Sequence, residues 1–315
     1  MPDPQSDNAF PGHGAGEVPD AFVLEVAGIS VRVVSANPSV RIAPGSASRA
    51  FLRASADGGA SVDAVLRVRA GDPANLESGR LVFDSGGVWR LFVLEDGTSC
   101  YRFHDARSGE RPYKILLLEA GEAEGEIVLD EASLSTTGPV DPLEFPLDEL
   151  LFLTLLARKG GVELHACGVR DPNGRGFLFA GHSVDGKTTM ARLWEAVPGA
   201  VVLSDDRIVV REGPAGRWEM HGTPWHGEAE LAANVSAGVA GIFVLGRGVE
   251  NGLRGMSRSE AVSALLSRSF PPFHSDRRLF SALGTLDGLV GRVPCRSLAF
   301  VPDEDVVRFV LEDGR

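Results

Sequence analysis

The chain has 315 residues, of which 43% are hydrophobic and 23% charged, and its formal net charge is −12. This length allows one large domain or two ordinary ones, and the composition is typical of a globular protein. The acidic balance argues against a general binder of nucleic acid or of an anionic membrane, because both need a basic surface.

Three further observations favour a cytoplasmic protein. No apolar run approaches the roughly 20 residues that a membrane-spanning helix needs. The first residues lack the basic start and apolar core of a signal peptide. Cys100, Cys167 and Cys295 have neither the spacing of a zinc site nor that of a disulfide framework, so we expect buried, reduced thiols. We therefore expect neither a membrane nor a nucleic acid among the partners.

Residues 21–140 are predicted to form a β-rich N-terminal domain, after a disordered tail over residues 1–20 that is poor in apolar residues. Short β-prone runs, such as residues 22–26, alternate here with turn formers such as Asp96-Gly97. Several aromatic and arginine residues could form a recognition face or pack a sheet, and we favour packing: Trp89, Arg90, Tyr101, Arg102 and Tyr113.

Residues 141–315 are predicted to form a second domain with helices. The leucine-rich segment 146–159 has acids in its first turn, bases in its last and Gly160-Gly161 beyond, which are the signals of a helix. A strand over 162–169 and a turn at 171–174 lead into a second apolar strand over 176–180. The segment that follows is therefore reached through a hairpin.

That segment, residues 181–188, fits the phosphate-binding pattern of Gly, four free positions, Gly, Lys and Ser or Thr. It follows an apolar strand and precedes a helix, which is the context that the pattern needs. Backbone N–H groups at such a helix start favour phosphate, Lys187 would reach the terminal phosphates, and the Thr188 hydroxyl would bind Mg²⁺. The predicted nucleotide-binding residues are Gly181, His182, Ser183, Val184, Asp185, Gly186, Lys187, Thr188 and Thr189.

A second concentration of charge, Asp205-Asp206, follows an apolar strand over 200–204. This is the expected place for an acid that holds magnesium beside a phosphate-binding loop. Adjacent side chains on an extended chain point to opposite faces, so the two carboxylates need not share one task. One could bind Mg²⁺ while the other faces the phosphate acceptor.

The remaining chain contains further predicted elements. Residues 221–228 are predicted to form a fixed loop in which His226 and Glu228 could contact substrate or metal. A strand is expected at 241–245, a capping box from Ser257 to Glu260 opens a helix, and another helix runs to Val290. The chain is expected to end in strands at 297–301 and 306–311.

The ordered set of His165, the loop and Asp205-Asp206 resembles the C-terminal catalytic domain of HPr kinase/phosphorylase, a relative of ATP-dependent phosphoenolpyruvate carboxykinase. The resemblance implies a mixed α/β (α+β) fold, with a P-loop core of that type after a smaller β-rich N-terminal domain. It also implies ATP and Mg²⁺ as cofactors, and self-association. The expected reaction is phosphoryl transfer to a Ser/Thr hydroxyl of a peptide, protein or small molecule.

The resemblance carries roles to single residues. Lys187 and Thr188 would bind triphosphate and Mg²⁺, Asp205 would help to hold the metal, Asp206 would take the proton of the hydroxyl, and His165 would lie near the transferred phosphoryl group. The loop departs from the family's usual Gly-x-Ser-Gly-Val-Gly-Lys-Ser-Glu, because Asp185 adds negative charge unless its side chain points outward.

Two other functions fit parts of the sequence. The irregular loop and the unfamiliar N-terminal half favour a non-catalytic, nucleotide-binding regulatory module. A carboxykinase-type enzyme acting on an oxaloacetate-like acid would call for extra metal-binding and arginine clusters, which we cannot assign. We rank the kinase first.

Overall fold

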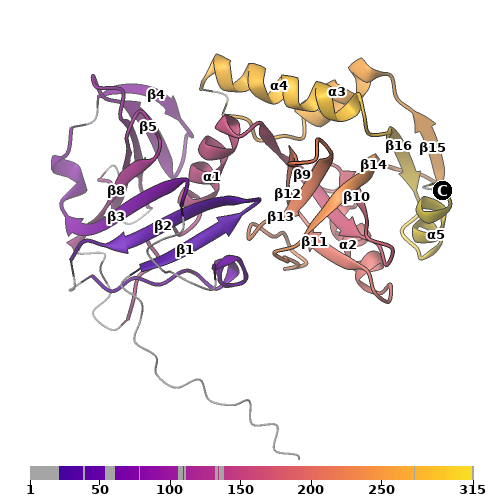
Figure 1. The fold of residues 1–315 in the computed structure, drawn as a ribbon, viewed down its shortest axis with the longest axis horizontal. Coiled ribbons are helices and arrows are strands. Elements are labelled where there is room, and N and C mark those ends of the chain that lie inside the picture. Colours follow the sequence, from indigo (N-terminus) through magenta and orange to yellow (C-terminus); the bar gives the residue numbers. More distant parts are fainter. Residues whose placement is uncertain are drawn as a thin grey trace, which may run out of the picture.

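The computed structural model describes residues 21–37, 40–53, 61–77, 79–105, 109, 111–131, 134, 138–272 and 274–313. The tail expected over residues 1–20 lies outside the described residues. Two large mixed sheets and a few helices make up the described part, so a mixed α/β fold is confirmed. The two sheets lie side by side, with helix α1 (Leu147–Arg158) between them (Figure 1).

The first sheet has eight strands in the order β1-β2-β3-β8-β7-β6-β5-β4. The pairs β2–β3 and β3–β8 are parallel and the others antiparallel. Alternate residues such as Leu24 and Val26, or Leu66 and Val68, point into one core, as a pleated strand requires. The strands are β1 (Ala21–Val26), β2 (Ile29–Ser35), β3 (Ala64–Gly71), β4 (Arg80–Asp84), β5 (Trp89–Val93), β6 (Ser99–Phe103), β7 (Lys114–Leu118) and β8 (Glu124–Asp130).

The second sheet follows the order β10-β9-β12-β13-β14-β16-β15, and β11 pairs with β9. Because β14 also pairs in parallel with β10, five of these strands close into a ring. The predicted hairpin before the loop is confirmed, since β9 and β10 are antiparallel neighbours. The strands are β9 (Gly161–Arg170), β10 (Arg175–Ala180), β11 (Val201–Ser204), β12 (Arg207–Glu212), β13 (Trp218–Gly222), β14 (Ser236–Arg247), β15 (Gly252–Gly255) and β16 (Cys295–Phe300).

Most helices lie where the sequence predicts them, and the capping box between Ser257 and Glu260 is present. One expected strand is wrong: residues 306–311 belong to a helix. Val306, Val307 and Val310 lie in the core at helical spacing, and this periodicity overrides the strand propensity of their β-branched side chains. The helices are α1 (Leu147–Arg158), α2 (Lys187–Glu195), α3 (Arg258–Leu266), α4 (Asp276–Val290), α5 (Asp305–Asp313) and the 3₁₀ turns η1 (Ala47–Phe51) and η2 (Pro73–Asn75).

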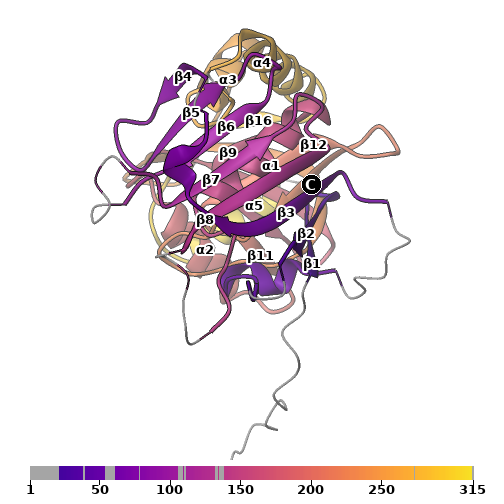
Figure 2. The ribbon, with the colours of Figure 1, turned by 90° about the vertical axis from the view of Figure 1, so that its left-hand side faces the viewer.

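Helix α1 belongs to the core of the first sheet, although it follows the boundary predicted near residue 140. Its residues Leu151 and Leu155 pack in the same apolar cluster as the first sheet, and Trp225 from the second half of the chain joins them. Viewed from the side of this sheet, β7 and β8 pass in front of α1 (Figure 2). The Arg211 guanidinium also donates to the Ala27 carbonyl at 2.8 Å. Apolar contacts therefore continue across the predicted boundary.

Most of the aromatic and arginine residues singled out above pack within the first sheet, as predicted, whereas Arg90 pairs with Asp84 at the surface. Trp89 stacks on Phe83 with ring centroids 4.9 Å apart, and the buried Arg102 lies over Phe92 at 5.6 Å. Tyr101 is buried and its hydroxyl lies 3.0 Å from that of Thr154 on α1. The sheet therefore uses these side chains to hold its own strands and α1.

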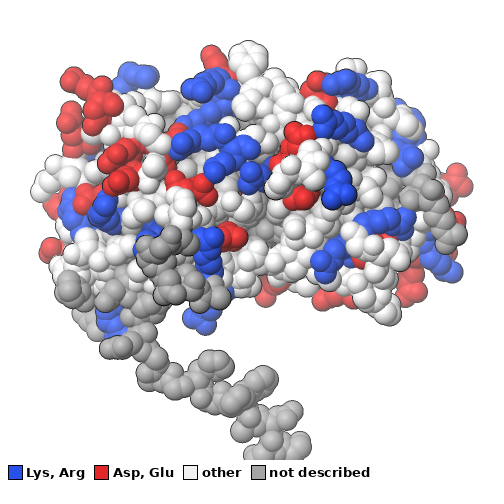
Figure 3. Space-filling model, in the orientation of Figure 1, with Lys and Arg blue, Asp and Glu red and all other residues white. Residues whose placement is uncertain are grey.

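The surface mixes both signs of charge. On the face drawn in Figure 3, Lys and Arg gather at the upper middle, where α1 and α4 lie in Figure 1. Arg158, Arg277 and Arg278 line a cavity of about 510 Å³ there.

The three cysteines are free. Cys100 and Cys167 are buried and Cys295 is half-buried. Within the described ranges, no helix combines the length and the apolar character that crossing a bilayer demands.

Candidate active site

The loop at residues 181–186 connects β10 to α2, so the predicted order of strand, glycine-bounded loop and helix is present. Gly186 has a φ of +100° and caps α2, a conformation that favours glycine. Gly181 is also constrained, since a Cβ there would lie 2.9 Å from that of Asp185. Behind the loop, Met190 and Trp194 of α2 are fully buried. The first N–H groups of α2 have no partner within the helix, which is the condition for an anion to bind there.

We expect Gly186→Ala to destabilise the protein by about 2–3 kcal/mol, because it adds strain at positive φ and a clash. The new Cβ would lie 2.6 Å from Cζ of Phe300 in the core. Gly174→Ala is the matched control, since Gly174 has a φ of +84° but open space around it, and we expect it to cost about 1 kcal/mol. Urea unfolding measures both, and equal losses would contradict a role for the Phe300 contact.

Lys187 lies at the start of α2 and joins the loop to Asp206. Its ammonium donates to the His182 carbonyl at 3.1 Å and lies 3.7 Å from Oδ1 of Asp206. The residue is only 5% exposed. Burial lowers the pKa of Lys187, although the negative charge of Asp206 opposes this effect. The cation therefore faces the loop and the carboxylate together.

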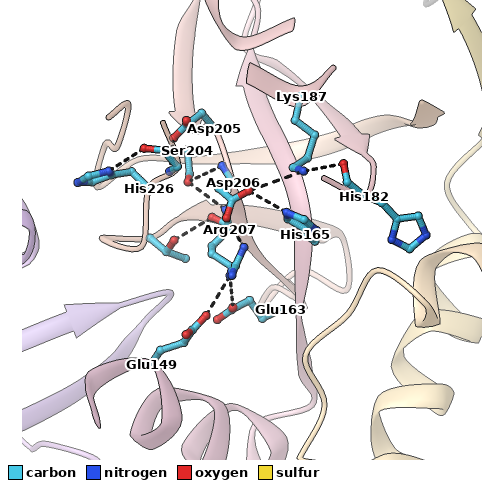
Figure 4. A network of polar contacts seen from close by, with 12 residues as sticks. Glu149, Glu163, His165, His182, Lys187, Ser204, Asp205, Asp206, Arg207 and His226 are labelled. Carbon is cyan, nitrogen blue, oxygen red and sulfur yellow. Dashed lines mark hydrogen bonds and ion pairs between the residues drawn. The ribbon is translucent and has the colours of Figure 1, made fainter. Parts of the chain in front are cut away.

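The side chain of Asp185 is held at the loop itself. One carboxylate oxygen, Oδ2, accepts from the His182 N–H at 2.6 Å and lies 3.7 Å from the Arg268 guanidinium. Its negative charge, which the sequence marks as a departure, is therefore opposed by an arginine from beyond α3. The imidazole of His182 points away from Lys187 (Figure 4), and Ser183 and Val184 are exposed. Thr188 and Thr189 lie half-buried on the first turn of α2.

Asp206 lies at the centre of a polar cluster that also holds His165 and Lys187 (Figure 4). Nε2 of His165 lies 2.8 Å from Oδ1 of Asp206, and Arg207 pairs with the other carboxylate oxygen. Burial tends to raise the pKa of Asp206, but the hydrogen bond with His165 and the charges of Arg207 and Lys187 outweigh it and lower the pKa below its ordinary value. The carboxylate is thus ionised at neutral pH. The structure brings the three predicted catalytic residues together.

Asp205 has different hydrogen-bond partners from its neighbour, so the two carboxylates do not share one task. Its two carboxylate oxygens accept from the N–H groups of Gly227 (2.8 Å) and Ala229 (2.9 Å), and the residue is 1% exposed. Residues 221 and 222 of the predicted loop belong to β13, and Asp205 anchors the remaining 223–228 loop, whose His226 and Glu228 are both exposed. Its assignment as a metal ligand stays a prediction. In the part of the chain that the structure describes, no three His, Cys, Asp or Glu residues gather as a metal site.

Four residues that the sequence analysis did not select form a cluster around one of them, Arg207. Its Nε lies 3.0 Å from Glu149 of α1 and 3.6 Å from Glu163 of β9, and its guanidinium lies 4.2 Å above the Phe270 ring. Burial and the nearby Glu149 raise the pKa of Glu163 well above its ordinary value. One signal was visible: an acid between Val162 and Leu164 interrupts an apolar strand, and acids are rarely buried unless paired.

A buried carboxyl at the start of α1 makes stability depend on pH. Burial raises the pKa of Asp148 to about 7, although Trp225 Nε1 (2.8 Å) and the Glu149 N–H (2.7 Å) donate to it. Because the folded pKa exceeds the unfolded one, the stabilisation is complete below pH 4 and is lost as the pH rises through 7. The raised pKa of Glu163 acts in the same direction.

We therefore expect the free energy of unfolding to fall between pH 5 and 7, with at most about 1.4 kcal/mol per pH unit from each of these two groups. Asp148→Asn should make this slope shallower. Asp96→Asn is the control. Folding lowers the pKa of Asp96, so this carboxyl titrates below the measured pH range in both the folded and the unfolded protein. Urea unfolding across this range measures the slope, and an unchanged slope in Asp148→Asn would exclude Asp148 as a source.

Comparison with protein-family models and with curated proteins assigns no role to this site. No protein-family model matches the chain, and no curated protein matches it significantly.

Proposed function

We propose that the chain is an ATP-dependent kinase that transfers the γ-phosphoryl group to the hydroxyl of a peptide, protein or small molecule. The observation that carries this proposal is the 3.7 Å approach of Lys187 to Asp206. The Lys187 cation at the glycine-bounded loop lies next to the ionised Asp206 carboxylate. Phosphoryl transfer needs such a pair, because the cation would bind the phosphate donor and the carboxylate would contact the hydroxyl of the acceptor. We also propose that the second half of the chain has a P-loop core of the HPr-kinase type.

The nucleotide would be bound by residues of the loop and of the first turn of α2. The N–H groups of that turn and the Lys187 ammonium would contact the phosphate oxygens. Two oxygen ligands would suit Mg²⁺, which prefers oxygen: the Thr188 hydroxyl and the Asp205 carboxylate. The Asp205 oxygens keep free lone pairs beside the hydrogen bonds that they accept from two amides. Mg²⁺ would supply charge neutralisation on the phosphates.

The chemical step would take place beside Asp206. As the acceptor oxygen forms its bond to the γ-phosphorus, Oδ1 or Oδ2 of Asp206 takes the hydroxyl proton, and the bond between the γ-phosphorus and the bridging oxygen breaks to leave ADP. The charge that develops on the bridging oxygen is offset by Lys187. His165 and Arg207 hold the carboxylate from two sides and orient it.

A non-catalytic nucleotide-binding module is the second candidate, and one observation favours it. Asp206 is already paired with His165, Lys187 and Arg207, so an incoming hydroxyl has to share a carboxylate that three side chains already contact. A module of this kind would bind Mg-ATP without transferring phosphate.

Calorimetric titration with Mg-ATP, followed by incubation with γ-labelled ATP and hydroxyl compounds, tests the proposal. We expect saturable binding and label that appears on an alcohol rather than only in inorganic phosphate. Absence of binding would refute the nucleotide site. Binding without transfer would favour the regulatory module.

A further inference from the structure

A cavity of about 390 Å³ opens beside Asp206, on the side of the carboxylate that faces the first sheet. Its walls come from distant segments: Ala47 on η1, Asp141 and Phe145 before α1, Asp206 and Arg207, and Trp225 in the 223–228 loop. Its volume lies in the range of small-ligand sites, which often form at domain junctions. The cavity therefore joins both halves of the chain at the proposed base.

We infer that this cavity binds the phosphate acceptor, and that the acceptor is an alcohol with an apolar body and no negative charge. The inference rests on the proposed kinase function and adds a substrate class to it. It also assigns the N-terminal half a task, since this half supplies one wall of the acceptor site. The alcohol could be the side chain of a peptide or a free small molecule, because both present the same chemistry.

The walls of the cavity are held by contacts of their own. Trp225 is 7% exposed, donates to Asp148 at 2.8 Å and packs against Phe152 with ring centroids 5.9 Å apart. Asp141 accepts from the N–H of Gly45 at 2.9 Å and from that of Leu143 at 3.0 Å, which ties the η1 side to the start of α1. A preformed wall of this kind lowers the entropy cost of binding.

The chemistry of the lining decides the class of alcohol. Phe145, with 64% of its surface exposed, Pro224 and Trp225 offer an apolar surface. Among the charged residues that line the cavity, carboxylates outnumber the single arginine, Arg207, and this arginine is itself shared by Asp206 and Glu149. A negatively charged acceptor would meet like charge in a partly desolvated site, which disfavours its binding.

The test fills the cavity from its rim. Ala47 is exposed and lines the cavity, so Ala47→Trp would occupy the space without disturbing a core; Ala50→Trp, on the same short helix but outside the cavity, is the matched control. The probes are capped Ser-containing heptapeptides with Leu and Lys neighbours or with Asp neighbours, and as free alcohols 2-phenylethanol and glycerate. Each is incubated with γ-labelled ATP, and Mg-ATP affinity is measured in parallel.

We expect transfer to the Leu/Lys peptides or to 2-phenylethanol, and none to the Asp peptides or glycerate. Ala47→Trp should lower kcat/KM for the accepted probe at least about tenfold, while Ala50→Trp and the Mg-ATP affinity of both variants stay within about twofold of wild type. The arm that accepts label identifies peptide or free alcohol as the source.

Three outcomes would overturn the inference. Preference for the acidic probes would refute the substrate class, and equal kcat/KM in the two tryptophan variants would refute the cavity. Mg-ATP binding without transfer to any probe would remove the acceptor site and leave the regulatory module. Failure of the wild type to bind Mg-ATP is a separate result, which would overturn the proposed function itself.

Discussion

Lys187→Met is expected to weaken Mg-ATP binding by at least about 100-fold, or about 2.7 kcal/mol. The substitution removes the ammonium that would meet the terminal phosphates, and hydrogen bonds to charged groups have individual contributions of this order. Methionine keeps most of the aliphatic stem, so the buried position at the start of α2 stays filled. Calorimetric titration with Mg-ATP measures the loss.

The matched control is Lys159→Met at the end of α1. Lys159 is 43% exposed, and its ammonium lies 2.6 Å from Asp63, far from the loop in the sequence. We expect its Mg-ATP affinity to equal that of wild type and its stability to change by less than about 1 kcal/mol. Thermal unfolding should show Lys187→Met folded as well. A folded Lys187→Met variant that binds Mg-ATP normally would disprove the assignment of the loop.

Asp206→Asn is expected to lower phosphoryl transfer by about 10²- to 10⁴-fold, because an amide cannot take the hydroxyl proton. Mg-ATP affinity should change only a few-fold, since Lys187 and the first turn of α2 remain. The fold should persist, because Arg207 keeps Glu149 and Glu163 as partners and its stacking on Phe270. Initial rates of label transfer at saturating Mg-ATP measure the effect, and undiminished transfer would exclude Asp206 as the base.

Asp205→Asn gives an informative contrast at the neighbouring residue. Its carboxylate accepts from two loop N–H groups, and an amide has a single acceptor oxygen, so one of these donors would lose its partner. We expect a loss of about 1–3 kcal/mol in the free energy of unfolding, with a much smaller change in Asp206→Asn. Urea unfolding of the two variants therefore separates the anchor from the base. Equal stability losses would contradict this division.

Several elements could be predicted from the sequence because their causes are local. The capping box at Ser257 satisfies N–H groups within three residues, and the turn after Asp171 joins two strands that pair directly. The loop pattern depends on glycines where backbone geometry demands them, as the φ of +100° at Gly186 demonstrates. Helix α5 was mispredicted because Val306, Val307 and Val310 favour strands by propensity but follow a helical period in a core that only the fold supplies.

Three features follow from short runs of sequence with their own backbone requirements: the loop, the hairpin before it and the acid pair after it. The tertiary structure sets what each acid faces: Asp205 faces the loop at Gly227, and Asp206 faces His165 and Lys187. It also decided that Glu149, 58 residues from Arg207 in the chain, holds this arginine, and that η1 borders a cavity beside the proposed base. Contacts of this kind come from packing between distant segments, and no spacing in the sequence encodes them.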